Sequence, residues 1–91
     1  MSTIQRIRQK IQRGEFFFTT HALEELSDEG FSAQDAVDAI MRGSINRTLS
    51  YDLRGTRYCI VGQTDDQRFL EVVCRFQADS NLVIITCYDV T

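Results

Sequence analysis

The N-terminal half of the chain repeats its apolar residues at helical spacing. Near the start, a basic amphipathic stretch predicts a short helix that ends at Gly14, with its apolar face formed by Ile4, Ile7 and Ile11. A second helix is predicted from about His21 to Glu29. It follows Thr19 and Thr20, either of which offers a hydroxyl that can cap the first turn. Two helices are therefore expected before residue 30.

A third helix is marked at both of its ends. Ser32 and Asp35 have the spacing of a capping box, and Gly43 stands where a helix C-terminus is expected. Before the second helix, three consecutive phenylalanines, Phe16 to Phe18, form what the pattern predicts to be a short connection. The segment from about residue 3 to residue 43 is thus predicted to be helical.

Beyond Gly43 the apolar period changes from helical to alternating. Four runs are rich in β-branched and aromatic residues and are separated by short polar connectors: Ile45 to Tyr51, Thr56 to Val61, Arg68 to Phe76 and Leu82 to Tyr88. The connectors run from Asp52 to Gly55, from Gln63 to Gln67 and from Gln77 to Asn81. Short connectors imply antiparallel pairing of consecutive strands. The predicted fold class is α+β, with the N-terminal helices packed on one face of a four-stranded antiparallel sheet.

The third run shows which sheet face the helices cover. Alternation places four apolar residues on one face: Leu70, Val72, Cys74 and Phe76. The other face carries a mixed set: Phe69, Glu71, Val73 and Arg75. The first set is expected to face the helices, which leaves Arg75 on the opposite face.

Length and composition fit one small globular domain. The 91 residues are 43% hydrophobic and 25% charged, and we expect a single domain over 1–91 with its sheet part at about 45–89. The longest uncharged apolar run, Leu82 to Ile85, is too short to cross a bilayer, so we expect a cytoplasmic protein without a membrane partner. The three cysteines form no C-x-x-C pair, which argues against a disulfide framework.

Charge is distributed unevenly along the chain. Residues 1–14 carry four cations and no acid, whereas residues 15–41 carry seven acids and neither Lys nor Arg. The formal net charge of −3 argues against general coating of nucleic acid, which depends on phosphate neutralisation. Nine of the ten cations are Arg, whose planar guanidinium suits phosphate and carboxylate. A site for an anion would therefore be local.

His21 is the only histidine and the first candidate for proton transfer. Imidazole is the side chain that gives and takes a proton near neutral pH. The alternative interpretation is structural: a partly buried residue that caps the helix or packs against the phenylalanines.

Three further candidates lie in the strand segments: Arg57, Arg75 and Tyr88. Side chains of matching parity on neighbouring antiparallel strands stand about 5 Å apart, so these residues and His21 are predicted to converge on one sheet face. There the arginines would bind a phosphate, and His or Tyr would transfer protons. The alternative is that the strand arginines pair with acids of the helical segment.

A metal site is not expected. Cys59, Cys74 and Cys87 would complete a four-ligand set with His21, but they lack the closely spaced ligand pairs of structural zinc sites. A Cys-His nucleophile would need an exposed thiol in a positive environment, for which no local pattern speaks. We therefore expect neither a metal nor another cofactor.

An ordered set of short motifs resembles the small bacterial domain of unknown function 4258, from about Phe16 to Tyr88. The motifs are Thr20-His21-Ala22, Gly30-Phe31-Ser32, Arg42-Gly43, Arg57-Tyr58-x-Ile60-x-Gly62, Arg68-x-Leu70-x-Val72-Val73 and Ile84-Ile85-Thr86-x-Tyr88. That family is thought to belong with the RelE-like toxins and related metal-independent ribonucleases of toxin-antitoxin systems. The resemblance implies helices on a curved sheet, with an RNA-binding cleft on the other face.

The resemblance also implies a role for each candidate. His21 would be the acid or base, Arg57 and Arg75 would hold the phosphate, and Tyr88 would be a second proton donor or a stacking platform. The leading hypothesis is an endoribonuclease that needs no metal. One alternative is a non-catalytic interaction module that binds a cognate protein through the sheet face or the acidic helices. Another is a homodimer formed through an exposed last strand.

Overall fold

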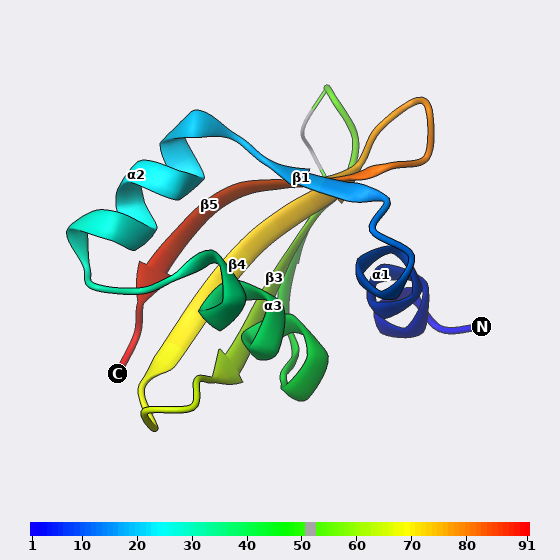
Figure 1. The fold of residues 1–91 in the computed structure, drawn as a ribbon. Helices are drawn as coiled ribbons and strands as arrows, with labels where there is room; N and C mark the ends of the chain where they lie inside the picture. Colours follow the sequence, from blue (N-terminus) through cyan, green and yellow to red (C-terminus); the bar gives the residue numbers. More distant parts are fainter. Residues whose placement is uncertain (51–52) are drawn as a thin grey trace.

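The computed structural model describes residues 1–50 and 53–91. Within them the elements follow in the order α1 (Thr3–Gln12), β1 (Phe16–Phe18), α2 (Thr20–Asp28), α3 (Ala33–Arg42), β2 (Ser44–Leu49), β3 (Arg57–Gln63), β4 (Phe69–Phe76) and β5 (Leu82–Asp89). Figure 1 shows α3 in front of the sheet, α2 beside β5, and α1 near the opposite end of β1. The predicted first strand extended to Tyr51 and the next connector began at Asp52, both outside the described residues. The α+β class is confirmed.

In the part of the chain that the structure describes, the sheet has five strands in the order β1-β5-β4-β3-β2. The antiparallel pairing of consecutive strands from β2 to β5 is as predicted. The prediction of a purely antiparallel four-stranded sheet was wrong, because Phe16–Phe18 is a strand parallel to β5 rather than a connection. Three residues are too few to show a strand period, and their partners lie 66 residues further along the chain, at Leu82 to Ile84.

The last strand is not an exposed edge, so the predicted route to a homodimer was wrong in this respect. The first part of β5 pairs with β1, and its later part lies beside α2. There the Glu25 carboxylate accepts a hydrogen bond from the Cys87 backbone amide at 3.2 Å. The Glu29 carboxylate accepts one from the Asp89 amide at 2.5 Å. Two glutamates one helical turn apart thus continue the hydrogen bonding that β1 begins.

Helix starts follow the capping signals in the sequence. The Ser32 and Asp35 capping box is formed, and Ser2 makes a second one with Gln5. Of the two candidate threonines, Thr19 caps α2: its Oγ1 accepts from the Ala22 amide at 3.0 Å and donates to the Ile85 carbonyl at 2.8 Å. The Ile85 carbonyl lies at the irregularity where β5 shifts register against β4. This contact fixes the start of α2 to the edge of the sheet.

The core lies between the helices and one face of the sheet. The predicted core face of β4 is confirmed, because Leu70, Val72 and Cys74 are fully buried and Phe76 packs against the same cluster. From the helices come Ile7, Ile11, Ala22, Leu26, Ala36, Ala39 and Ile40. No helix among the described residues is long and apolar enough to span a membrane.

Candidate functional site

The sheet face that carries no helix, here called the helix-free face, holds most of the candidate residues. On β4 this face presents Phe69, Glu71, Val73 and Arg75, the predicted mixed set. Cys59, Val73 and Val83 are buried on this face, although they do not belong to the core cluster under the helices. The floor of the face is therefore made of small residues, and longer polar side chains lie around and above them.

Arg57 and Arg75 lie side by side on the helix-free face. Tyr58 pairs with Cys74, and both pack in the core, so the next position on each strand points to the opposite face. This places the two arginines about 5 Å apart at the backbone. Guanidiniums on two such neighbouring side chains can hold an anion between them.

The guanidinium of Arg75 is available for a ligand. Within residues 1–50 and 53–91, Arg75 makes neither a hydrogen bond nor an ion pair, so it does not pair with a helix acid. It lines a surface hollow of about 340 Å³ together with Gln77, Ala78 and Asp79 of the turn between β4 and β5. The Asp79 carboxylate accepts a hydrogen bond from the Asn81 backbone amide at 3.0 Å.

Tyr88 shares the helix-free face but lies further along the strands. It stands across from Glu71, whereas Arg75 lies four residues beyond Glu71 on β4. Four residues of strand span about 14 Å, so the Tyr88 backbone does not meet the arginine pair. The Tyr88 hydroxyl accepts a hydrogen bond from Arg47 at 3.0 Å.

An ion pair that the sequence did not indicate crosses the same face. Arg47 of β2 reaches over β3 to Glu71 of β4, at 2.7 Å, and its cross-strand neighbour is Cys59. The Glu71 side chain is only 5% exposed, whereas that of Arg47 is 51% exposed. In the sequence Glu71 looks like an ordinary solvent-facing acid, because alternation does not reveal that an arginine two strands away covers it.

His21 lies on α2, the helix that packs beside β5, and its side chain is 67% exposed. Its Nε2 is 3.2 Å from Glu25, and the same carboxylate accepts a hydrogen bond from the Thr86 hydroxyl of β5. The structural alternative, a partly buried residue that caps the helix, is therefore not what is found, because His21 is exposed and Thr19 is the cap. The structure places it at the rim of the sheet, and its joint role with the arginines stays a prediction.

The three cysteines are buried thiols without a disulfide. Burial raises the pKa of Cys59, although Arg47 nearby acts in the opposite direction. Burial also raises the pKa of Cys74 and of Cys87, each to about 12. A protonated, inaccessible thiol is a poor nucleophile. Among the described residues no group of His, Cys, Asp and Glu is arranged to hold a metal ion.

These thiols predict a loss of stability at alkaline pH. Cys74 and Cys87 hold their protons more tightly in the folded chain than at the ordinary value of 9.0. The contribution of these two thiols to the free energy of unfolding is therefore fully present below pH 9 and is lost as the pH rises toward 12. We expect denaturant unfolding to show a steeper alkaline decline for wild type than for a variant carrying Cys74→Val and Cys87→Val. Parallel declines would contradict this assignment.

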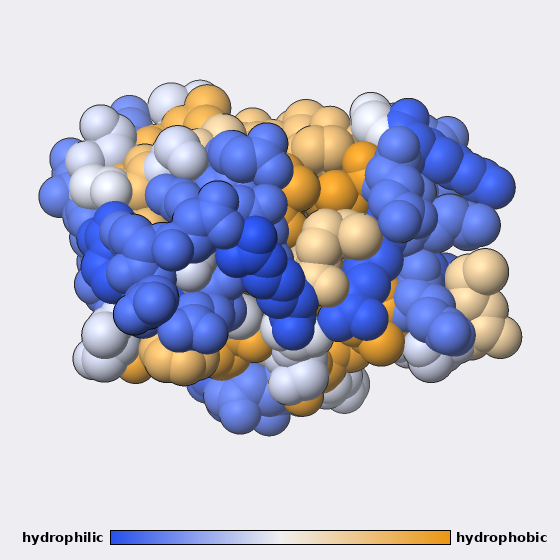
Figure 2. All heavy atoms as spheres, turned by 60° about the horizontal axis from the view of Figure 1, so that its bottom comes forward, coloured by the Kyte–Doolittle hydropathy of each residue, from blue (hydrophilic) through white to orange (hydrophobic). Residues whose placement is uncertain are grey.

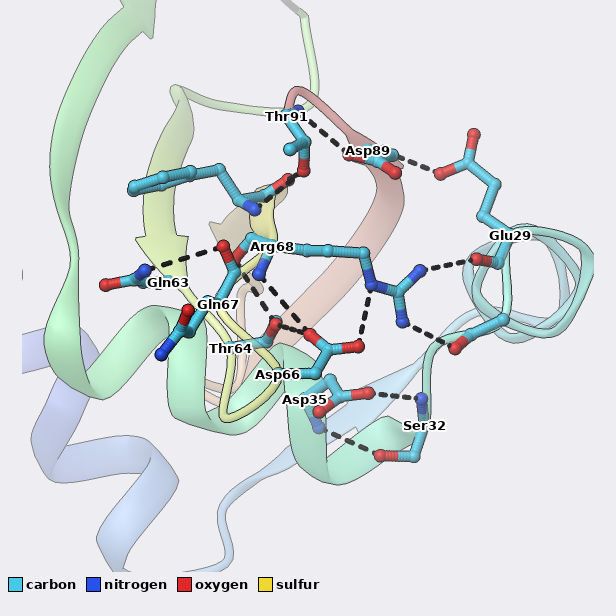
Figure 3. A network of polar contacts seen from close by, with 12 residues as sticks. Glu29, Ser32, Asp35, Gln63, Thr64, Asp66, Gln67, Arg68, Asp89 and Thr91 are labelled. Carbon is cyan, nitrogen blue, oxygen red and sulfur yellow. Dashed lines mark hydrogen bonds and ion pairs between the residues drawn. The ribbon is translucent and has the colours of Figure 1, made fainter.

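A dense polar network around Arg68 has a structural role (Figure 3). The guanidinium donates to the carbonyls of Glu29 and Gly30 at the end of α2, at 3.0 and 2.8 Å, and to Asp66 at 2.8 Å. It also stacks on the Phe31 ring, 3.8 Å from its centroid. With its donors used in this way, Arg68 joins the β3–β4 turn to α2 and is not a candidate for substrate binding.

The helix-bearing side offers less chemistry. Figure 2, in which the bottom of Figure 1 comes forward, shows apolar surface between two hydrophilic areas. On the helix-bearing side, a groove of about 500 Å³ is lined by Met1, Gln5, Arg8, Gln9, Gln12 and Met41. The Arg8 guanidinium already donates to the carbonyls of Ile40 and Gly43. The side chains that line the groove include no carboxylate, thiol, hydroxyl or imidazole for a reaction.

The fold and the helix-free face define a small α+β domain with its candidate chemistry on an open sheet surface. The family model of the Domain of unknown function (DUF4258) matches residues 18–89. The chain belongs to this family. Neither the curated proteins nor the solved structures gave a match to the chain.

Proposed function

We propose that this protein is a metal-independent endoribonuclease of the RelE-like type, which acts on single-stranded RNA at the helix-free face. The observation that carries the proposal is the placement of Arg57 beside Arg75 on neighbouring strands, with Arg75 available for a ligand. Two guanidiniums bind the scissile phosphate and stabilise the charge that grows on it in the transition state.

The cleavage needs one base and one acid. The base removes the proton of the ribose 2′-hydroxyl, the 2′-oxygen attacks phosphorus, and the bond from phosphorus to the 5′-oxygen breaks. The acid returns a proton to the leaving 5′-oxygen, and the products carry a 2′,3′-cyclic phosphate and a 5′-hydroxyl. His21, at the rim of the face, is the proposed acid or base, and Tyr88 the second donor or a stacking platform. No step requires a metal.

The test is cleavage of a fluorescently labelled single-stranded RNA in the presence of EDTA. We expect wild type to cleave it, His21→Ala and Arg57→Ala to be inactive, and Arg75→Ala to lose at least about tenfold in rate. The control is Arg13→Ala, which removes the same charge from the end of α1. Equal activity in all variants would indicate a contaminating nuclease and would overturn the proposal.

The second candidate is a non-catalytic module that binds a cognate protein. It is favoured by the engagement of both proton-transfer candidates, since His21 contacts Glu25 and Tyr88 contacts Arg47. Two exposed phenylalanines on the helix-free face, Phe17 and Phe69, also suit a protein partner. Absence of RNA cleavage by wild type would favour this function over the first.

A further inference from the structure

Arg75 belongs to a row of cross-strand neighbours that runs across the strands to the edge of the sheet at β1. Arg75 pairs with Val83 of β5, and Val83 pairs with Phe17 of β1. Phe16 and Phe18, on either side, pack against the core, so Phe17 points to the helix-free face. Two strand spacings separate Phe17 from Arg75, about 10 Å at the backbone.

Phe17 is a strand residue that is 44% exposed. Its two neighbours of the same type are partly buried, and its row partner Val83 is 2% exposed. Packing of the core does not require an aromatic residue at this position. An exposed aromatic ring about one nucleotide's reach from a phosphate-binding pair is the arrangement with which proteins stack unpaired bases.

We propose that Phe17 is a base-stacking platform for the nucleotide next to the phosphate held by Arg57 and Arg75. This inference rests on the proposed function and deepens it, because it assigns the substrate class as RNA with an unpaired base beside the cleaved bond. A base within a duplex is stacked on its neighbours and cannot lie on the ring. The inference does not depend on which residue transfers the protons.

The structure offers a matched control at the other end of the same face. Phe69 is 42% exposed, close to the value for Phe17, and also lies on the helix-free face. It stands six residues from Arg75 on β4, which is about 20 Å of strand. If the loss of any exposed phenylalanine weakened RNA binding, substitutions at Phe17 and Phe69 would both do so. If Phe17 stacks a base beside the arginine pair, only the substitution at Phe17 weakens binding.

The experiment measures binding by fluorescence anisotropy of a short single-stranded RNA that carries 2′-O-methyl groups, so that cleavage is blocked. We expect Phe17→Ala to weaken binding about fivefold to a hundredfold, and Phe17→Leu to weaken it similarly because leucine has no π-face. Phe17→Tyr should bind like wild type, and Phe69→Ala should stay within about twofold of it. Thermal melting of each variant verifies that it is folded.

An abasic nucleotide completes the test. One abasic position in the RNA should weaken binding to wild type and remove the difference between wild type and Phe17→Ala. Wild-type affinity in Phe17→Ala or Phe17→Leu, together with weaker binding by Arg75→Ala, would overturn the stacking platform and leave the proposed function in place. Unchanged binding by Arg75→Ala would overturn the proposed function itself.

Discussion

Gly62→Ala is expected to lower the free energy of unfolding by about 3 kcal/mol or more. A Cβ at Gly62 would lie 2.0 Å from the Ala39 carbonyl oxygen and 2.6 Å from its carbon. These are backbone atoms of α3, so no side chain can rotate away and the whole helix has to move off β3. The backbone of Gly62 does not lie in the left-handed region, which makes the cost steric rather than conformational.

The measurement is denaturant or thermal unfolding of Gly62→Ala and of Gly14→Ala. Gly14 has a φ of +69° and no atom within 4 Å of an added Cβ. Its replacement should therefore cost only the conformational penalty of about 1–2 kcal/mol. For a domain of this size, 3 kcal/mol corresponds to a lowering of the melting temperature by about 12–24 °C. Equal losses in the two variants would contradict the close packing of α3 on β3.

The ion pair across the helix-free face should respond unequally to removal of its two members. Arg47→Met leaves the Glu71 carboxylate, 5% exposed, without its charged partner, and we expect a loss of about 3 kcal/mol. Glu71→Leu leaves Arg47 at a half-exposed position from which the guanidinium can reach solvent, so the expected loss is about 1 kcal/mol. The burial of the remaining partner, rather than the distance between the two charges, decides which substitution lowers the stability more.

A double variant separates the two contributions. Arg47→Met combined with Glu71→Leu replaces the pair by apolar side chains of similar volume, and we expect its stability to lie within about 1 kcal/mol of wild type. Chemical denaturation of the four proteins gives the coupling energy. Additive losses in the double variant would show that the contact contributes nothing as a pair.

The sequence predicted the local structure more completely than the long-range structure. α3 was predicted because Ser32 and Asp35 form a capping box that needs only neighbouring residues. β1 was missed because Phe16–Phe18 becomes a strand only through β5, which lies far along the chain. Which β4 residues face the helices was predicted correctly, because alternation along a strand is a local property. The same prediction placed Arg75 on the correct face.

The candidate site shows the same division. Alternation assigned Arg75 to the helix-free face, and the observed register makes Arg57 its neighbour. The distance of Tyr88 from this pair depends on register, and the place of His21 depends on how α2 lies against β5, so neither could be predicted. The pairing of Arg47 with Glu71 could not be predicted from the sequence. A charged residue that another segment of the chain buries has the same sequence pattern as one that stays on the surface.

The contact of α2 with β5 limits how this sheet can grow. Beyond the three residues of β1, the carboxylates of Glu25 and Glu29 accept hydrogen bonds from the Cys87 and Asp89 amides, so an incoming peptide finds these backbone donors of β5 already satisfied. Strand addition, the route by which many sheet proteins aggregate or exchange segments, is then left with the short outer edge of β1 and with β2. There the bulge between Ile45 and Arg47 interrupts a regular ladder. A partner that adds a strand to this sheet would therefore find a longer edge at β2 than at the three-residue β1.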